Sequence, residues 1–208
     1  MNLEERVQWV YDSKSNAELV ERYQKWASTY EQDMFQGFDY QSPRLLAEAF
    51  KKFVTTDAKI LDVGSGTGLM GQTLSSLGYH NLVALDMSEE MLDIACEKGV
   101  YESLHIGILG QPLNFPSNTF DAVAGIGIFT LGHAPASSFD ELVRVTKPSG
   151  LILFTLYSDL YDIGEFPEKF AALEASGAWS LQEVSDELQP LPVGEPEATV
   201  RVIVYEVN

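Results

Sequence analysis

Three glycines at alternating positions follow a short apolar run. Residues 60–68 read ILDVGSGTG, with Gly64, Gly66 and Gly68 in the turn. Glycine lets the backbone pass close to a ligand where a Cβ would collide. Two ligand classes use such a turn: a dinucleotide, whose pyrophosphate lies at a helix N-terminus, and S-adenosylmethionine, which carries no phosphate. Residues 66–71, GTGLMG, also match the G-x-G-x-x-G pattern, so the turn alone leaves both ligands open.

Two carboxylates near the turn help to separate these ligands. Asp62 lies two residues before Gly64, where it would oppose a pyrophosphate but stabilise the cationic ammonium and sulfonium of S-adenosylmethionine. Asp86 ends the next apolar run, 20 residues after Gly66, and is expected to accept hydrogen bonds from both ribose hydroxyls, which either ligand would supply. Met87 is expected to lie against the adenine. The acid at position 62 therefore favours S-adenosylmethionine.

Alternating strand and helix patterns are needed to bring these side chains to one edge of a sheet. The pattern predicts a doubly wound, mostly parallel α/β sheet with helices on both faces and an antiparallel C-terminal hairpin. Ligands of such sheets bind beyond the carboxyl ends of the strands. The expected strands are 59–63, 82–85, 103–108, 120–126, 151–156, 180–188 and 199–207, and the expected helices are 3–10, 17–26, 43–53 with Ser42 as N-cap, 69–77, 88–99, 138–145 and 167–176.

The length of 208 residues fits one principal domain. We expect residues 1–42 to form a helical N-terminal cover and residues 43–208 to form the ligand-binding domain. The single cysteine, Cys96, excludes an internal disulfide, and no Cys/His cluster has the spacing of a metal site.

The charge balance bears on the choice of partner. The chain has 31 acidic and 13 basic side chains, a net charge of −18, and its basic residues are scattered. Such a chain repels polyanions at long range, so no nucleic acid and no membrane is expected as a partner. No signal segment and no run of about 20 apolar residues is visible, which predicts a cytoplasmic location.

Four segments in order resemble the class I (Rossmann-like) S-adenosylmethionine-dependent methyltransferases. They are ILDVGSGTG (60–68), VALDMSEEML (83–92), FPSNTFD (115–121) and LVRVTKPSGLILF (142–154), and together they cover roughly residues 58–156. Residues 23–30, YQKWASTY, are similar to the segment that closes over the cofactor in many members that act on small molecules. With GHAP (132–135), they resemble the Williams–Beuren-region methyltransferase-like branch.

The resemblance implies a cofactor site made by residues from several segments. It implies that the three glycines contact S-adenosylmethionine, that Asp86 holds the ribose, and that Tyr23 and Tyr30 cover the methionine end. The family often has an acid after the third strand; Gly107 and Ile108 stand there, so the adenine is expected to rely on backbone groups near Leu109 and Gly110. The remaining expected contacts with the cofactor are Ser65, Gly125 and Ile126. The resemblance also implies a small-molecule methyl acceptor as the partner and S-adenosylhomocysteine as the product.

Methyl transfer from a sulfonium is an in-line displacement that needs a base only when the acceptor is protonated. His133 follows the fourth expected strand, at the correct end of the sheet, and is the candidate base; a structural hydrogen bond is the other interpretation. The aromatic residues expected to shape an acceptor pocket are Tyr30, Phe129, Tyr157 and Tyr161. A catalytically idle S-adenosylmethionine-binding protein and an NAD-binding oxidoreductase are the alternative functions.

Overall fold

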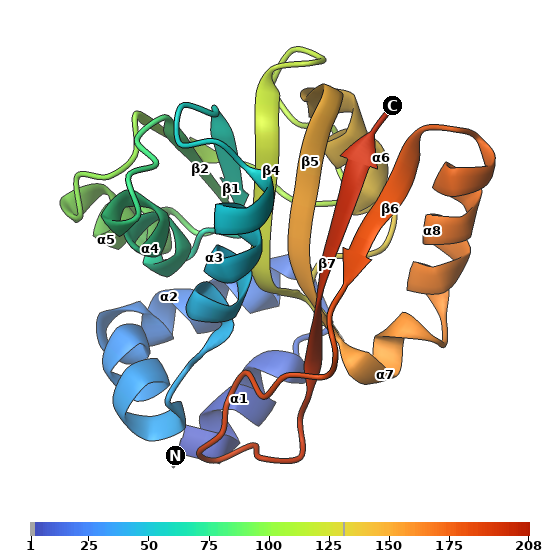
Figure 1. The fold of residues 1–208 in the computed structure, drawn as a ribbon. Helices are drawn as coiled ribbons and strands as arrows, with labels where there is room; N and C mark the ends of the chain where they lie inside the picture. The colour runs from blue at the N-terminus through green and yellow to red at the C-terminus, as the bar shows by residue number, and fades with distance from the viewer. Residues whose placement is uncertain (1–2, 131) are drawn as a thin grey trace.

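A seven-stranded sheet forms the centre of the computed structural model, which describes residues 3–130 and 132–208 (Figure 1). Its strands are β1 (Ile60–Val63), β2 (Leu82–Asp86), β3 (Ser103–Ile106), β4 (Phe120–Phe129), β5 (Thr146–Tyr157), β6 (Trp179–Val184) and β7 (Val200–Val207). The order is β3-β2-β1-β4-β5-β7-β6. Strands β1 to β5 pair in parallel, whereas β7 is antiparallel to β5 and β6. The predicted mostly parallel sheet with an antiparallel C-terminal pair is confirmed.

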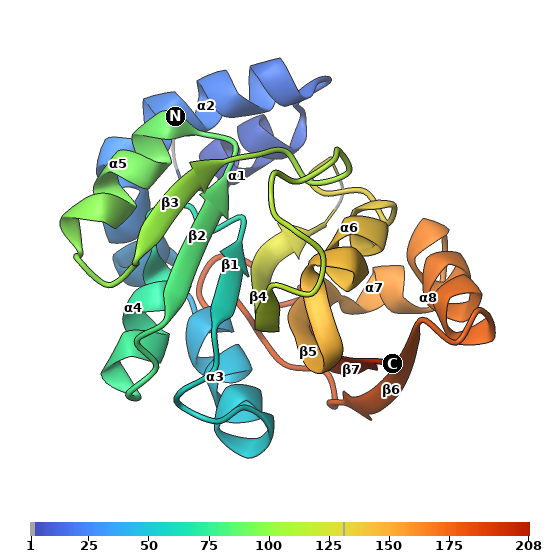
Figure 2. The ribbon, with the colours of Figure 1, turned by 90° about the horizontal axis from the view of Figure 1, so that it is seen from above.

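Helices cover both faces of the sheet (Figure 2). One face carries α3 (Ser42–Phe53), α4 (Leu69–Ser76) and α5 (Glu89–Glu97), and the other carries α6 (Ser138–Val145), α7 (Ser158–Tyr161) and α8 (Glu165–Ala175). Successive strand side chains point to opposite faces: Ile60 belongs to the apolar cluster that contains residues of α3 and α4, and Leu61 belongs to the one that contains residues of α6 and α8. No helix in the described part of the chain is long and apolar enough to cross a bilayer. The cytoplasmic location stays a prediction.

Local end signals account for several helix boundaries. The Ser88 hydroxyl accepts a hydrogen bond from the Met91 amide and caps α5, as predicted. Gly78 follows the end of α4 with a φ of 93°, which glycine adopts without strain. The prediction for Ser42 is wrong: α3 already begins at this residue, and its side chain is buried next to Tyr40 rather than capping the helix.

The N-terminal helices lie across the carboxyl ends of the parallel strands (Figure 1). They are α1 (Leu3–Tyr11), α2 (Asn16–Gln32) and the π-helical turn η1 (Asp33–Gly37), which together we call the cover. The Asp33 carboxylate joins them, because it accepts hydrogen bonds from Arg6 of α1 and from the Trp26 indole of α2, the latter at 2.7 Å. An apolar cluster packs the cover against Leu191 in the β6–β7 connection.

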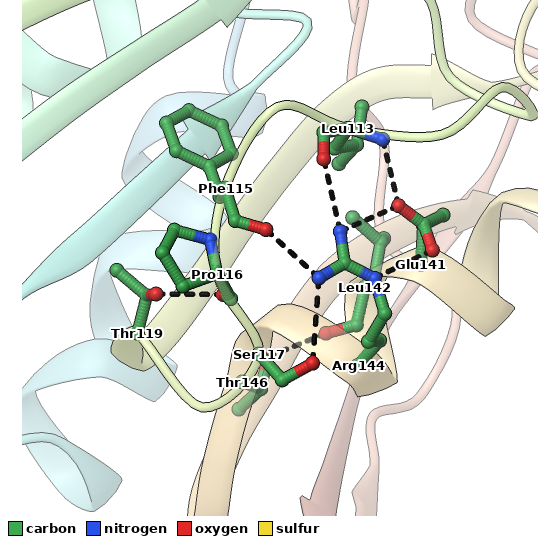
Figure 3. A network of polar contacts seen from close by, with 9 residues as sticks. All are labelled: Leu113, Phe115, Pro116, Ser117, Thr119, Glu141, Leu142, Arg144 and Thr146. Carbon is green, nitrogen blue, oxygen red and sulfur yellow. Dashed lines mark hydrogen bonds and ion pairs between the residues drawn. The ribbon is translucent and has the colours of Figure 1, made fainter.

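A loop, residues 107–119, connects β3 to β4 and is held by a polar network from α6 (Figure 3). The Arg144 guanidinium donates to the carbonyl oxygens of Leu113 at 2.9 Å and Phe115 at 2.8 Å. The Glu141 carboxylate accepts from Arg144 and from the Leu113 amide at 2.6 Å. One guanidinium thus satisfies backbone groups that a helix in this connection would have paired internally.

We predict that Arg144→Met lowers the free energy of unfolding by about 1–3 kcal/mol, because two loop carbonyls lose charged donors. Urea denaturation measures the change. The control is Lys25→Met, which breaks an exposed ion pair with Glu21 on α2 and should cost no more than about 0.5 kcal/mol. Equal effects of the two substitutions would contradict the role given to the network.

A buried carboxyl lies in the middle of β1. Asp62 is 0% exposed; its Oδ2 accepts a hydrogen bond from the Tyr101 hydroxyl at 2.6 Å, and the Tyr101 oxygen accepts one from the Gly71 amide at 3.2 Å. Its Oδ1 has no hydrogen-bond partner among the described residues. Burial raises the pKa of Asp62 to about 7, against the lowering effect of the Tyr101 hydrogen bond, and the charge of Asp86 adds to the rise.

This raised pKa predicts a stability that falls as the pH rises. Between about pH 4 and pH 7 the folded chain holds a proton on Asp62 that the unfolded chain has released. The free energy of unfolding should therefore decline through this window by up to about 1.4 kcal/mol per pH unit from this group. Asp62→Asn should remove that decline, measured as urea midpoints across the window.

Asp93→Asn, which changes an exposed α5 carboxyl, is the control and should leave the slope as in the wild type. If Asp62→Asn showed the wild-type slope as well, Asp62 would be ionised in the folded protein and the assignment would fail.

Candidate functional site

A cavity lies between the carboxyl ends of the central strands and the cover. It encloses about 1290 Å³ of empty space, counting its open mouth. The strand ends supply its floor, the cover supplies its roof, and the β6–β7 connection adds Pro190 and Leu191. The position is the one expected for a doubly wound sheet.

Most of the predicted site residues meet at this cavity. Those that line it are Tyr23, Tyr30, Gly64, Gly66, Asp86, Met87, Leu109, Ile126 and His133. They come from α2, from the turn after β1, from the end of β2, from the loop after β3 and from the end of β4. Segments that are far apart in the sequence therefore form one surface, because parallel strands all end at the same edge of the sheet.

The other predicted contacts do not line the cavity, and each has a local reason. Asp62 points toward Tyr101 instead. At Gly68 a Cβ would lie 3.0 Å from the Tyr101 ring, and at Gly110 it would lie 2.7 Å from Pro135. Gly125 lies inside β4, and Ser65 is buried in the turn. Their expected contacts with a cofactor rest on the sequence alone.

Two glycines of the turn serve different purposes. Gly64 has a φ of 61°, and a Cβ there would lie 2.2 Å from the Ile128 side chain, so the collision is with the protein itself and not with a ligand. Gly66 has a φ of 52°, and a Cβ there would meet nothing within 4 Å, so this glycine faces the open cavity. Of these two glycines, only Gly66 leaves open space where a Cβ would lie, and the contacts of both with a cofactor stay predictions.

Asp86 anchors this turn to the end of β2. Its Oδ2 accepts a hydrogen bond from the Gly66 amide at 2.8 Å, and its Oδ1 accepts one from the Ser88 amide at 2.9 Å. Burial raises the pKa of Asp86, and the amide hydrogen bonds oppose that rise. A carboxylate has about four lone-pair sites, so both oxygens keep acceptor capacity for a ligand in the cavity.

The charges of the wall fit a cationic nucleoside. Among the described lining residues, Asp86 is the one carboxylate, and none is a lysine or arginine. The described wall offers a pyrophosphate no cation, whereas its one carboxylate would stabilise an ammonium or a sulfonium. These residues therefore fit S-adenosylmethionine better than a dinucleotide.

His133 forms a hydrogen-bonded chain with residues on both sides. Its Nε2 lies 2.9 Å from the Tyr23 hydroxyl, and its Nδ1 lies 2.9 Å from the Thr130 hydroxyl. Burial raises the pKa of Tyr23, and the charge of Asp86 adds to this effect. Sequence reasoning named both Tyr23 and His133 but missed their contact, because 110 residues separate them.

The aromatic residues expected around an acceptor divide into two groups. Tyr30 and Tyr157 line the cavity. Phe129 is instead 0% exposed in the core, stacked on Phe139, and the ring of Tyr161 lies under the Arg201 guanidinium, so neither is part of the wall.

Several lining residues were missed from the sequence, among them Tyr11, Tyr40 and Leu191. Tyr11 of α1 places its hydroxyl 3.1 Å from that of Tyr157, and Tyr40 and Leu191 also line the cavity. The apolar spacing of α1 could have indicated a buried face, but no local signal marks a loop residue such as Leu191.

Comparisons with known proteins agree with this site. Residues 61–154 match the model of the methyltransferase domain family. Methyltransferase-like protein 27 of Homo sapiens is 34% identical over 182 residues, which cover 84% of this chain and 73% of the relative. A TehB-like S-adenosylmethionine-dependent methyltransferase structure from Corynebacterium glutamicum superposes with a TM-score of 0.66 at 18% identity, over 90% of this chain and 99% of that chain. This last likeness shows the fold alone.

The comparisons also correct one expectation. An 18S rRNA (guanine-N(7))-methyltransferase of Arabidopsis thaliana is 38% identical over 125 residues, which cover 59% of this chain and 43% of the relative. The matches to this protein and to its counterpart in Bos taurus span less than half of each relative. Excluding nucleic acid on net charge was therefore wrong, because net charge describes the distant field and relatives with RNA acceptors share this domain.

The human relative and the cavity together establish the class, and the narrower Williams–Beuren-region branch stays a prediction. The family, the glycine turn, the Asp86 anchor and the cationic fit of the wall all agree on the cofactor. This chain belongs to the class I S-adenosylmethionine-dependent methyltransferases.

Proposed function

We propose that this methyltransferase transfers the methyl group to a small-molecule acceptor bound in the covered cavity. The observation that carries the proposal is the roof: the cover and the β6–β7 connection close over the strand ends and leave an enclosed space lined mainly by aromatic and apolar side chains. Enclosed, water-poor sites suit methyl transfer, because the charge on sulfur disappears in the transition state.

S-adenosylmethionine supplies a methyl group on a cationic sulfur and leaves as S-adenosylhomocysteine. In the proposal Asp86 holds the ribose, Met87 and Leu109 contact the adenine, and Tyr23 and Tyr30 cover the methionine end. His133 is the proposed base. Residues 1–42 act as the cover segment, and residues 43–208 as the domain that binds the cofactor.

The names of two relatives are compatible with a small-molecule acceptor. A ubiquinone biosynthesis O-methyltransferase of Xylella fastidiosa is 29% identical over 104 residues, and a demethylmenaquinone methyltransferase of Clavibacter sepedonicus is 30% identical over 150 residues. An RNA base is the second candidate acceptor, and it is favoured by the 18S rRNA methyltransferases.

A labelling experiment separates these candidates. The protein is incubated with methyl-labelled S-adenosylmethionine and a cell extract, and the products are divided into a dialysable fraction and an RNA fraction. The proposal expects label in the dialysable fraction. Label confined to RNA would establish the second candidate, and cofactor binding without label in either fraction would indicate a catalytically idle binding protein.

We predict that Asp86→Ala weakens S-adenosylmethionine binding by about 1.5–3 kcal/mol, which is the scale of hydrogen bonds to a charged group. Titration calorimetry measures the affinity. Asp93→Ala, on the exposed face of α5, is the matched control and should bind as the wild type does. An unchanged affinity in Asp86→Ala would place the ribose elsewhere, and tight binding of NAD in place of both sulfur compounds would favour an oxidoreductase.

A further inference from the structure

We propose that Tyr23 and His133 form a proton relay that deprotonates a neutral hydroxyl acceptor, such as a phenol or an enol, so that this enzyme methylates oxygen. The inference rests on the proposed small-molecule acceptor and adds its chemical class. Three features carry it: the hydrogen-bonded chain at His133, the charges of the cavity wall, and a second hollow behind the imidazole.

The hydrogen-bonded chain has the geometry of a relay. The Tyr23 hydroxyl, on the cavity wall, lies 2.9 Å from His133 Nε2, and the Thr130 hydroxyl lies 2.9 Å from Nδ1. If Nδ1 donates its proton to the Thr130 oxygen, Nε2 is unprotonated and accepts the proton of Tyr23. Thr130 is then a positioning residue that selects this tautomer.

The wall selects the charge of the acceptor. Its described residues include no lysine or arginine to bind a carboxylate or a phosphate. Its one carboxylate, Asp86, is engaged by the Gly66 and Ser88 amides, and its charge acts on Tyr23. The charge of Glu195, which lines a separate surface hollow, acts on Tyr11 and Tyr157. The wall therefore disfavours an anionic acceptor, and the hydrogen-bonded chain at His133 favours a hydroxyl acceptor that enters as a neutral molecule.

The part of the wall near His133 offers hydroxyls and apolar surface. The hydroxyls of Tyr11 and Tyr157 lie 3.1 Å from each other, and Leu191 adds apolar area. Aromatic side chains with polar ends suit planar acceptors that carry a hydroxyl group. His133 is the one imidazole of the described wall, and a neutral imidazole has one ring nitrogen that accepts a proton.

The proposed step balances. The acceptor hydroxyl passes its proton to the Tyr23 oxygen as Tyr23 passes its own proton to His133 Nε2, which leaves an imidazolium and a neutral tyrosine. The acceptor oxygen forms the new C–O bond with its own electron pair, while the pair of the breaking C–S bond remains on sulfur. No further reactant is required.

The imidazolium also has a route for losing its proton. His133 and Thr130 line a second, surface hollow on the side of the α7–α8 connection, together with the charged residues Lys14 and Glu165. The proton can leave toward solvent through this hollow while the cover stays closed. A merely structural histidine would not require access to both spaces.

The test uses 4-nitrophenol, whose phenolate absorbs visible light and whose phenol form does not. The probe is added to the 208-residue chain saturated with S-adenosylhomocysteine, so that proton transfer is measured without turnover. In the wild type the bound probe should ionise at a pH about one unit or more below that of the free probe, because an imidazolium stabilises the phenolate. Tyr23→Phe and His133→Gln should each abolish this shift.

Two controls separate the relay from a structural role. His105→Gln changes a β3 histidine outside the cavity wall and should keep the wild-type shift. S-adenosylhomocysteine affinity of Tyr23→Phe should stay within about tenfold of the wild type, because the ring is kept and one neutral hydrogen bond is lost. Loss of the shift in His105→Gln as well would overturn the relay.

Turnover gives a second readout. Methylation of 4-nitrophenol should lose about 10²–10⁴-fold in kcat/KM in either single variant, and its acidic pH limb should disappear. The double variant should be no slower than His133→Gln alone, because the two residues act as one unit. Additive losses would overturn the relay.

The outcomes distinguish failure of the relay from failure of the proposed function. If 4-nitrophenol does not bind, or if label appears on amines or carboxylates with Tyr23→Phe unimpaired, the hydroxyl class and the relay are wrong while a small-molecule enzyme remains. If label appears only on RNA, the proposed function itself fails.

Discussion

The hydrogen bonds that Asp86 accepts from the Gly66 and Ser88 amides are the constraint on which the site depends. They join the glycine turn after β1 to the end of β2 and to the start of α5, so one carboxylate holds three elements in place. Hydrogen bonds to an ionised acceptor are among the stronger ones in proteins. Because backbone amides and not a cation satisfy this carboxylate, its remaining acceptor capacity faces the cavity and suits a neutral ribose or a cationic ligand.

The cover encloses the space beyond the carboxyl ends of the parallel strands. Its apolar cluster joins α1, α2 and Leu191, while Asp33 links α1 to α2. The same contacts that stabilise the cover therefore close the cavity over the strand ends. They also bring Tyr23 to His133, so the hydrogen-bonded chain exists only when α2 is docked against the loop after β4.

The sequence predicts what depends on near neighbours and fails where distant segments meet. The order of the strands and the Ser88 cap follow from local spacing and are confirmed. The strand ends are less exact, because β5 begins at Thr146 instead of residue 151 and β6 ends at Val184 instead of residue 188. The Tyr23–His133 contact and the place of Leu191 depend on how the cover docks, which no local pattern encodes. Asp62 shows a different limit: its position two residues before Gly64 was read as a contact, but the alternation of a buried strand turns its carboxyl toward Tyr101.

The family match covers only some of the segments that line the cavity, so family membership alone does not identify the methyl acceptor. The family match covers residues 61–154, which include the glycine turn, Asp86 and His133. The cover, Tyr157 and Leu191 lie outside it, yet they line the same cavity. A relative named as an 18S rRNA methyltransferase and one named for ubiquinone biosynthesis match 59% and 48% of this chain. In the proposed relay, Tyr23 is the residue through which the cover reaches His133 of the matched domain.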